Sequence, residues 1–174
     1  MELYSISMNP QPFKILFLCT GNSARSILAE YLFRRIAPGR FESYSAGANP
    51  TGKINPLVLR ILKEDYKIDA SDARSKSWTE YKDVHFDFVI TVCDHARESC
   101  PVWPGQPIVA HWASDDPAKF EGTEEEKLRL THNVALQIQR RLDLFCSLPL
   151  EKMERLKMAA AVGGIGAKEK PSDN

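Results

Sequence analysis

The strongest constraint on the fold is an apolar run that leads through a short turn into an amphipathic helix. Residues 13–19 read FKILFLC, which is typical of a parallel strand that is buried on both faces. After the turn, Leu28, Leu32 and Ile36 recur at intervals of four, as on one face of a helix. An Ala-Pro-Gly sequence then ends this helix. The first 39 residues therefore predict a β-α unit.

The same alternation continues along the chain. Short strands are expected at residues 41–46, 86–93 and 107–112, and helices are expected to start near Asn55 and Thr123. This order predicts an α/β fold with a single domain, whose mostly parallel four-stranded sheet carries helices on both faces. Ligands in such folds bind at the carboxyl ends of the strands.

The domain is expected to span residues 13–146 of the 174-residue chain. An N-terminal extension at residues 1–12 precedes it, and a C-terminal helical extension at residues 147–162 follows it. Residues 163–174 are rich in glycine and charge and predict a disordered tail. Within the domain, residues 94–106 are expected to form a long loop.

Charge and hydropathy exclude two classes of partner. The chain carries 23 basic and 23 acidic residues, and this balance argues against nucleic-acid binding. The longest apolar run, residues 15–19, is too short to span a membrane, and the first residues lack the pattern of a signal peptide. We therefore expect a cytoplasmic protein whose four cysteines are free thiols, a setting in which spaced cysteines are typically catalytic or metal-binding.

The turn after the first strand has the composition of an oxyanion-binding loop. Cys19 ends the strand and Arg25 opens the helix, so a guanidinium fork and a helix N-terminus face the thiol. This field is expected to lower the pKa of Cys19, and the Ser26 hydroxyl is expected to hydrogen-bond the thiolate. The backbone N–H groups that would surround the anion belong to Thr20, Gly21, Asn22, Ser23 and Ala24.

The pattern C-x5-R-S after an N-terminal strand resembles the low-molecular-weight protein tyrosine phosphatase family. The segments Tyr44–Gly47 and Asp115–Pro117 extend the resemblance, which covers about residues 13–146. It implies that Asp116, the aspartate directly before proline, is the general acid, with Asp115 as the second choice. Alone, Asp-Asp-Pro is more typical of a turn.

Two further cysteines make the chain similar to the arsenate reductases of this fold. Cys93 ends a predicted strand and Cys100 follows seven residues later, and residues 111–117 (HWASDDP) also match that group. The resemblance implies that Cys19 attacks arsenate, with phosphate as a competitor, and that Cys93 and Cys100 pass the resulting disulfide onward. It implies no bound cofactor, because the electrons come from thioredoxin or from glutaredoxin with glutathione.

Other interpretations stay open. A phosphatase would use Cys19, Arg25 and Asp116 without the later cysteines, and a non-enzymatic thiol sensor would bind an oxyanion without turnover. The spacing of Cys93 and Cys100 is not that of a usual zinc site, even if His95 and His111 are added, and no metal is expected. Cys146, at the end of an amphipathic helix, is expected to serve packing.

One departure from the family concerns a cation. The thioredoxin-coupled arsenate reductases hold a potassium ion near the anion loop, partly through an acidic residue after the second helix. The corresponding stretch here, residues 74–77, reads RSKS. We expect the Lys76 ammonium to replace the ion and to hydrogen-bond Asn22 or Ser45. This departure leaves the choice between the two reductants open.

Overall fold

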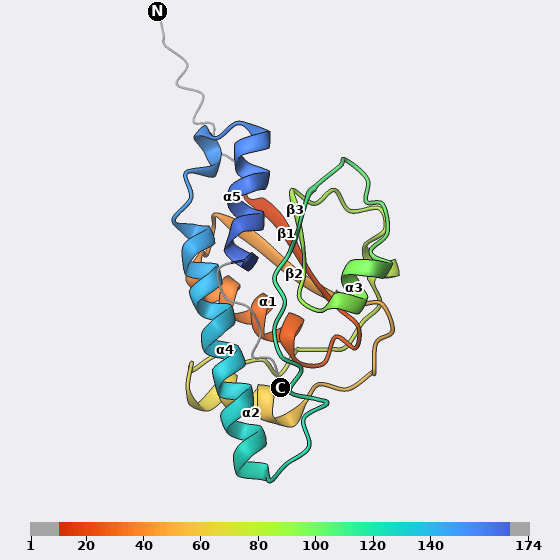
Figure 1. The fold of residues 1–174 in the computed structure, drawn as a ribbon, viewed down its shortest axis with the longest axis vertical. Coiled ribbons are helices and arrows are strands. Elements are labelled where there is room, and N and C mark those ends of the chain that lie inside the picture. The colour runs from red at the N-terminus through yellow and green to blue at the C-terminus, as the bar shows by residue number, and fades with distance from the viewer. Residues whose placement is uncertain (1–10, 168–174) are drawn as a thin grey trace, which may run out of the picture.

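The computed structural model describes residues 11–167 and contains one four-stranded sheet (Figure 1). All its strands are parallel, in the order β2-β1-β3-β4. The strands are β1 (Phe13–Cys19), β2 (Phe41–Gly47), β3 (Phe88–Thr91) and β4 (Ile108–His111). The helices are α1 (Arg25–Ile36), α2 (Pro56–Glu64), α3 (Asp94–Ser99), α4 (Glu124–Cys146) and α5 (Arg155–Ala167), with short 3-10 turns at Trp78–Tyr81 and Leu150–Lys152. The predicted α/β fold class is confirmed, and the sheet is wholly parallel.

The core is built around β1, which lies inside the sheet. Its residues from Ile15 to Cys19 are all buried, as a strand covered on both faces requires. In Figure 1, α1, α4 and α5 lie together on one side of the strands, and α3 lies on the other. Aromatic rings join the layers: Phe17 packs edge-to-face on Phe33 of α1, with ring centroids 6.0 Å apart.

The sequence signals for the helix starts act as expected. The Asn55 side chain accepts a hydrogen bond from the backbone of Leu57, and Pro56 occupies the first turn of α2. A capping box of Thr123 and Glu126 begins α4. Both helices therefore start where sequence analysis placed them.

Two predicted segments were wrong in part. Residues 94–99 of the expected loop form α3, whose first turn is capped by the Cys93 sulfur at 3.4 Å from the Ala96 nitrogen. The expected tail begins with helix, because α5 continues to Ala167, and the rest of it lies outside the described residues. A Cβ on Gly166 would lie 2.1 Å from the His111 carbonyl oxygen. The glycine there permits close packing of α5 on β4.

The carboxyl ends of the strands share one edge of the sheet and define where side chains can converge. Cys19 ends β1 and pairs in register with Gly47, which ends β2. Thr91 ends β3 opposite His111 of β4. Among the described residues, no helix combines the length and apolar character needed to cross a membrane.

Candidate active site

The loop between β1 and α1 encloses the Cys19 thiol. The backbone N–H of Asn22 donates to the Cys19 sulfur at 3.1 Å, and the Ser26 hydroxyl lies 2.8 Å from the same atom. Asn22 has a φ of 46°, in the left-handed region that asparagine tolerates better than most residues. The loop thus folds around the sulfur, with Ser26 on the thiol as the sequence predicted.

Gly47 makes room for this loop at the end of β2. A Cβ at Gly47 would lie 2.5 Å from the Thr20 carbonyl oxygen and 3.0 Å from the Asn22 nitrogen. Only glycine permits so close an approach of two backbones. The nearby carbonyl of Gly21 accepts a hydrogen bond from the Ser75 hydroxyl at 2.9 Å, so the loop is also held from the segment after α2.

The Asn22 side chain links the loop to a buried charged cluster. Its amide nitrogen donates to the hydroxyls of Ser26 at 2.9 Å and Ser45 at 3.0 Å, and its oxygen accepts from the Lys76 backbone at 2.9 Å. The Lys76 ammonium lies 3.2 Å from the Ser45 hydroxyl and 3.7 Å from the Glu30 carboxylate. Burial lowers the pKa of Lys76, and Glu30 opposes that shift. Ser45 also donates to Glu30.

Arg25 is fixed at the start of α1 by two other elements. One guanidinium nitrogen donates to the Ser114 carbonyl at 3.0 Å, and the other lies 3.0 Å from the Asp116 carboxylate. The carboxylate also accepts from the backbone of Ala118. Asp116 lines the cavity at Cys19, whereas Asp115 is not part of its lining. The structure therefore brings together the arginine and the aspartate that the family resemblance implied.

The predicted lowering of the Cys19 pKa was wrong in direction. The thiol is buried, and burial raises its pKa because the thiolate loses hydration. The hydrogen bond with Ser26, the charge of Arg25 and the Asn22 amide all favour the thiolate but only offset part of this effect. The loop thus reduces, without cancelling, the rise in the pKa of Cys19 that burial causes.

A cavity of about 460 Å³ opens over the loop and has two cysteines in its walls. Cys19 and Arg25 line it together with Asp116 and with Cys93, which follows β3. The Cys93 sulfur lies 3.3 Å from the Thr20 hydroxyl. Proximity to Cys93 also contributes to the raised pKa of Cys19.

Cys100 lies outside this cavity, at the far end of α3. Its thiol is half-buried and is 3.7 Å from the Pro101 carbonyl oxygen. Burial raises the pKa of Cys100, and the Trp103 indole partly offsets this shift. All four cysteines are free thiols in this structure. Of the three predicted relay thiols, Cys19 and Cys93 are buried and line the cavity, whereas Cys100 is partly exposed and does not line it.

Comparison with known proteins identifies the family. The family described as low molecular weight phosphotyrosine protein phosphatase matches residues 14–147. The chain belongs to this family. Its relatives include an arsenate reductase of Halalkalibacterium halodurans, 39% identical over 131 residues, which represent 75% of this chain and 93% of the relative.

Solved structures of the family extend the comparison. An arsenate reductase from Archaeoglobus fulgidus is 27% identical with a TM-score of 0.58, over 74% of this chain and 98% of that one. A thioredoxin-dependent arsenate reductase from Corynebacterium glutamicum is 29% identical with a TM-score of 0.56. This last match covers 77% of the present chain and 63% of the other.

Three residues near the site were not singled out by sequence analysis for the roles the structure gives them. Glu30 is buried beside Lys76, Arg141 of α4 donates to the Ala113 carbonyl at 2.7 Å, and Trp103 adjoins Cys100. For Glu30 and Arg141 the sequence did hold a signal, because each is a charged residue on a helix face that is otherwise mostly apolar. Trp103 gave no such signal, and its ring packs on Phe86 with centroids 5.7 Å apart.

The zinc interpretation finds no support in the part of the chain that the structure describes. No group of three or more histidine, cysteine or acidic side chains there is arranged to hold a metal ion. The His111 imidazole contacts Asp94 and Thr91, and the Cys93 thiol contacts Thr20. Cys146 lies far along α4, and burial raises its pKa to about 11.

Proposed function

We propose that this chain reduces arsenate to arsenite through a relay of Cys19, Cys93 and Cys100. The observation that carries the proposal is the cavity that holds both Cys19 and Cys93 over an oxyanion-binding loop. A phosphatase needs only the first of these thiols. The matches to two arsenate reductases, those of Halalkalibacterium halodurans and Bacillus subtilis, each cover 93% of the relative, which supports the same function.

The first step forms a bond between sulfur and arsenic. The Cys19 thiolate attacks arsenate, and Asp116 protonates the oxygen that leaves as water, giving an arsenic(V) thioester. Arg25 would bind two arsenate oxygens in place of its present contact with Asp116, which is 3.0 Å away. Arsenic is not yet reduced at this stage.

The second step transfers two electrons to arsenic, and the third moves the resulting disulfide to another pair of thiols. The Cys93 thiolate attacks the Cys19 sulfur, so the S–As bond breaks and its electron pair reduces arsenic to arsenite as a Cys19–Cys93 disulfide forms. The Cys100 thiolate then attacks Cys93, which releases the Cys19 thiolate and leaves a Cys93–Cys100 disulfide. An external dithiol reduces this disulfide with two electrons.

The buried Lys76 ammonium is proposed to take the place of a bound potassium ion. It lies within 3.7 Å of Glu30 and 3.2 Å of Ser45, which in turn hydrogen-bonds the Asn22 side chain. A fixed positive charge there would hold the loop in its anion-binding shape without a free cation. The prediction is that potassium does not change the KM for arsenate in the wild-type chain.

Thioredoxin is the favoured reductant, because the Corynebacterium relative is a thioredoxin-dependent enzyme. Glutaredoxin with glutathione is the alternative that the test must distinguish. Arsenate-dependent oxidation of each reduced protein is measured in separate assays, with p-nitrophenyl phosphate hydrolysis in parallel. Rapid hydrolysis without arsenate-dependent thiol oxidation would replace the proposed function with that of a phosphatase.

A cysteine variant tests the relay directly. Cys93→Ser should bind arsenate but fail to release arsenite, because no thiol attacks Cys19. Cys146→Ser is the matched control, since Cys146 lies outside the cavity. Normal turnover by Cys93→Ser would overturn the relay, and peptide mapping after one wild-type turnover should find Cys93 linked to Cys100.

A further inference from the structure

The relay imposes a movement on α3. Cys93 and Cys100 cap the two ends of this six-residue helix. At a helical rise of 1.5 Å per residue, their Cα atoms are roughly 10 Å apart, whereas a disulfide requires about 4.4–6.8 Å. A Cys93–Cys100 disulfide therefore forms only after α3 unwinds, which makes the contacts that keep α3 folded part of the reaction.

Few contacts hold α3 in place. Ala96 is its one buried residue, and the helix has no other apolar anchor. Its first residue, Asp94, is largely exposed, yet one carboxylate oxygen lies 2.9 Å from Nε2 of His111. Because a carboxylate can only accept, the imidazole donates this hydrogen bond.

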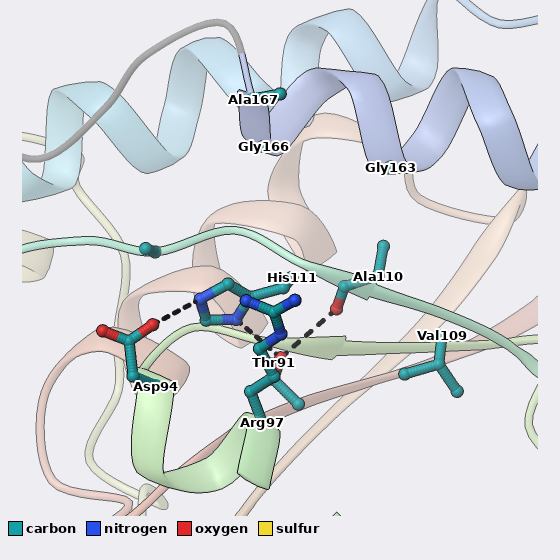
Figure 2. A pocket seen from close by; sticks show the side chains of 10 residues that line it. Thr91, Asp94, Arg97, Val109, Ala110, His111, Gly163, Gly166 and Ala167 are labelled. Atoms are coloured by element: carbon teal, nitrogen blue, oxygen red, sulfur yellow. Dashed lines mark hydrogen bonds and ion pairs between the residues drawn. The ribbon is translucent and has the colours of Figure 1, made fainter.

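His111 is itself fixed from the side opposite Asp94. Figure 2 shows its ring between Asp94 and Thr91, with Nδ1 2.8 Å from the Thr91 hydroxyl. Thr91 is buried at the end of β3. The imidazole therefore connects the rigid sheet edge to the first turn of α3.

The C-terminal helix supports the same segment from outside. The Trp112 indole donates to the Val162 carbonyl of α5 at 3.0 Å, and Gly166 packs directly on the His111 carbonyl. In Figure 2, Gly166 of α5 lies on the opposite side of His111 from α3. The family match ends at residue 147, so α5 is an addition to the matched domain.

We propose that His111 is a positioning residue that holds α3 folded through Asp94 and so sets how readily Cys93 and Cys100 can join. This inference rests on the proposed relay. When the contact breaks, α3 unwinds more easily, Cys93 is exposed and the disulfide is favoured over the two thiols. The contact thus stabilises the reduced state of this cysteine pair.

The test uses full-length Asp94→Ala and His111→Phe, and the double variant. Each single change should raise hydrogen exchange of the α3 amides and native-state alkylation of Cys93, resolved by peptide mapping, by about threefold to tenfold. The disulfide should then be favoured over the two thiols by the same factor. For a two-electron couple this makes the reduction potential of the Cys93–Cys100 pair more negative by about 15–30 mV. The double variant should match the larger single effect, because both changes remove one contact.

A second histidine–aspartate pair supplies the control. His132 and Asp65 are 3.0 Å apart on another part of the surface, and His132→Phe should change none of these quantities. Unchanged exchange and labelling in Asp94→Ala, or an equal change in His132→Phe, would overturn the proposal. If His111→Phe does not fold, Asp94→Ala still tests the proposal, because Asp94 is largely exposed.

These measurements need no arsenate, so they separate the two proposals. If the wild-type chain forms no Cys93–Cys100 disulfide with arsenate, the proposed relay is wrong. Hydrogen exchange in α3 still tests whether the contact between His111 and Asp94 holds the helix.

Discussion

The two cysteine-bearing segments of the site are held in different ways. The loop at residues 19–26 is fixed by its own backbone, by the end of β2 and by residues 75–76, and most of its residues are buried. The segment at residues 93–100 consists of the six-residue helix α3 between Cys93 and Cys100, and Ala96 is the one buried residue of that helix. Many contacts therefore hold the loop at residues 19–26 in place, whereas few hold the segment at residues 93–100.

This difference matches the chemistry proposed for each. Binding and activating an oxyanion rewards donors that already point at the anion, because no reorganisation is then needed during the reaction. Passing a disulfide from one thiol to the next requires the sulfurs to travel, so tight packing would slow it. The molecule thus combines a rigid anion site with a weakly held helix beside it. We call the loop at residues 19–26 the rigid half of the site and residues 93–100 its weakly held half.

The largest expected effect comes from Arg25→Lys, which challenges the rigid half. Lysine cannot offer the planar fork that Arg25 presents, and it would lose the contact with Ser114 or with Asp116. We expect kcat/KM for arsenate to fall by roughly 10²–10³-fold. Steady-state assays measure this, with thermal unfolding as a check on the fold, and a loss under tenfold would show that the fork is not needed.

Gly47→Ala tests whether the loop depends on backbone packing. The new Cβ would lie 2.5 Å from the Thr20 carbonyl oxygen, so the loop or β2 must shift. The free energy of unfolding should fall by about 1–3 kcal/mol, and arsenate binding should weaken. Urea denaturation measures the stability.

Gly163→Ala is the matched control for this change. No atom lies within 4 Å of a Cβ at that helical position. Alanine there should leave stability unchanged or raise it by up to about 1 kcal/mol. Equal stability of Gly47→Ala and the wild type would mean that the loop adapts without strain.

The rigid half was also the more predictable from sequence. The residues from Cys19 to Ser26 are adjacent in the chain, and glycine, asparagine and arginine each have a local geometric reason to be there. The partners that complete the site come from distant segments. Glu30 and Arg141 acquire their roles only when α1 meets β2 and α4 meets the segment before Asp116.

The weakly held half was harder to predict for a physical reason. The sequence DHARES has too little apolar periodicity to indicate a helix, and α3 owes its start to the cap by Cys93. The glycines of α5 indicated disorder, although packing against β4 keeps this segment helical. The raised pKa of Cys19 also escaped prediction, because the degree of burial is a tertiary property.

Ser26→Ala has a moderate expected effect, on the pH dependence of the rigid half. Its hydroxyl bond favours the Cys19 thiolate, so its loss should raise the pKa of Cys19 further. A higher pKa leaves less thiolate at neutral pH. Alkylation of Cys19 should slow several-fold there, and its midpoint should move to higher pH.

Ser43→Ala is the matched control for Ser26. Ser43 is also buried, but its hydroxyl donates to the Glu30 carbonyl at 2.8 Å and not to a thiol. The alkylation profile of Cys19 should therefore stay unchanged. A shift of equal size in both variants would assign the effect to packing near β2.

The smallest expected effect comes from Trp103→Phe, which examines the weakly held half. The Trp103 nitrogen makes no hydrogen bond of good geometry, yet the indole lowers the pKa of Cys100 against the effect of burial. Phenylalanine keeps a ring against Phe86 and removes the N–H. The pKa of Cys100 should rise, and its attack on Cys93 should slow by about twofold to threefold at neutral pH. Arsenite release precedes this attack, so the rate of arsenite release in a single turnover should not change.

Trp78→Phe is the control, because Trp78 does not affect the pKa of Cys100. Slower arsenite release in Trp103→Phe would place the tryptophan's influence on the anion site and weaken the division between the two halves.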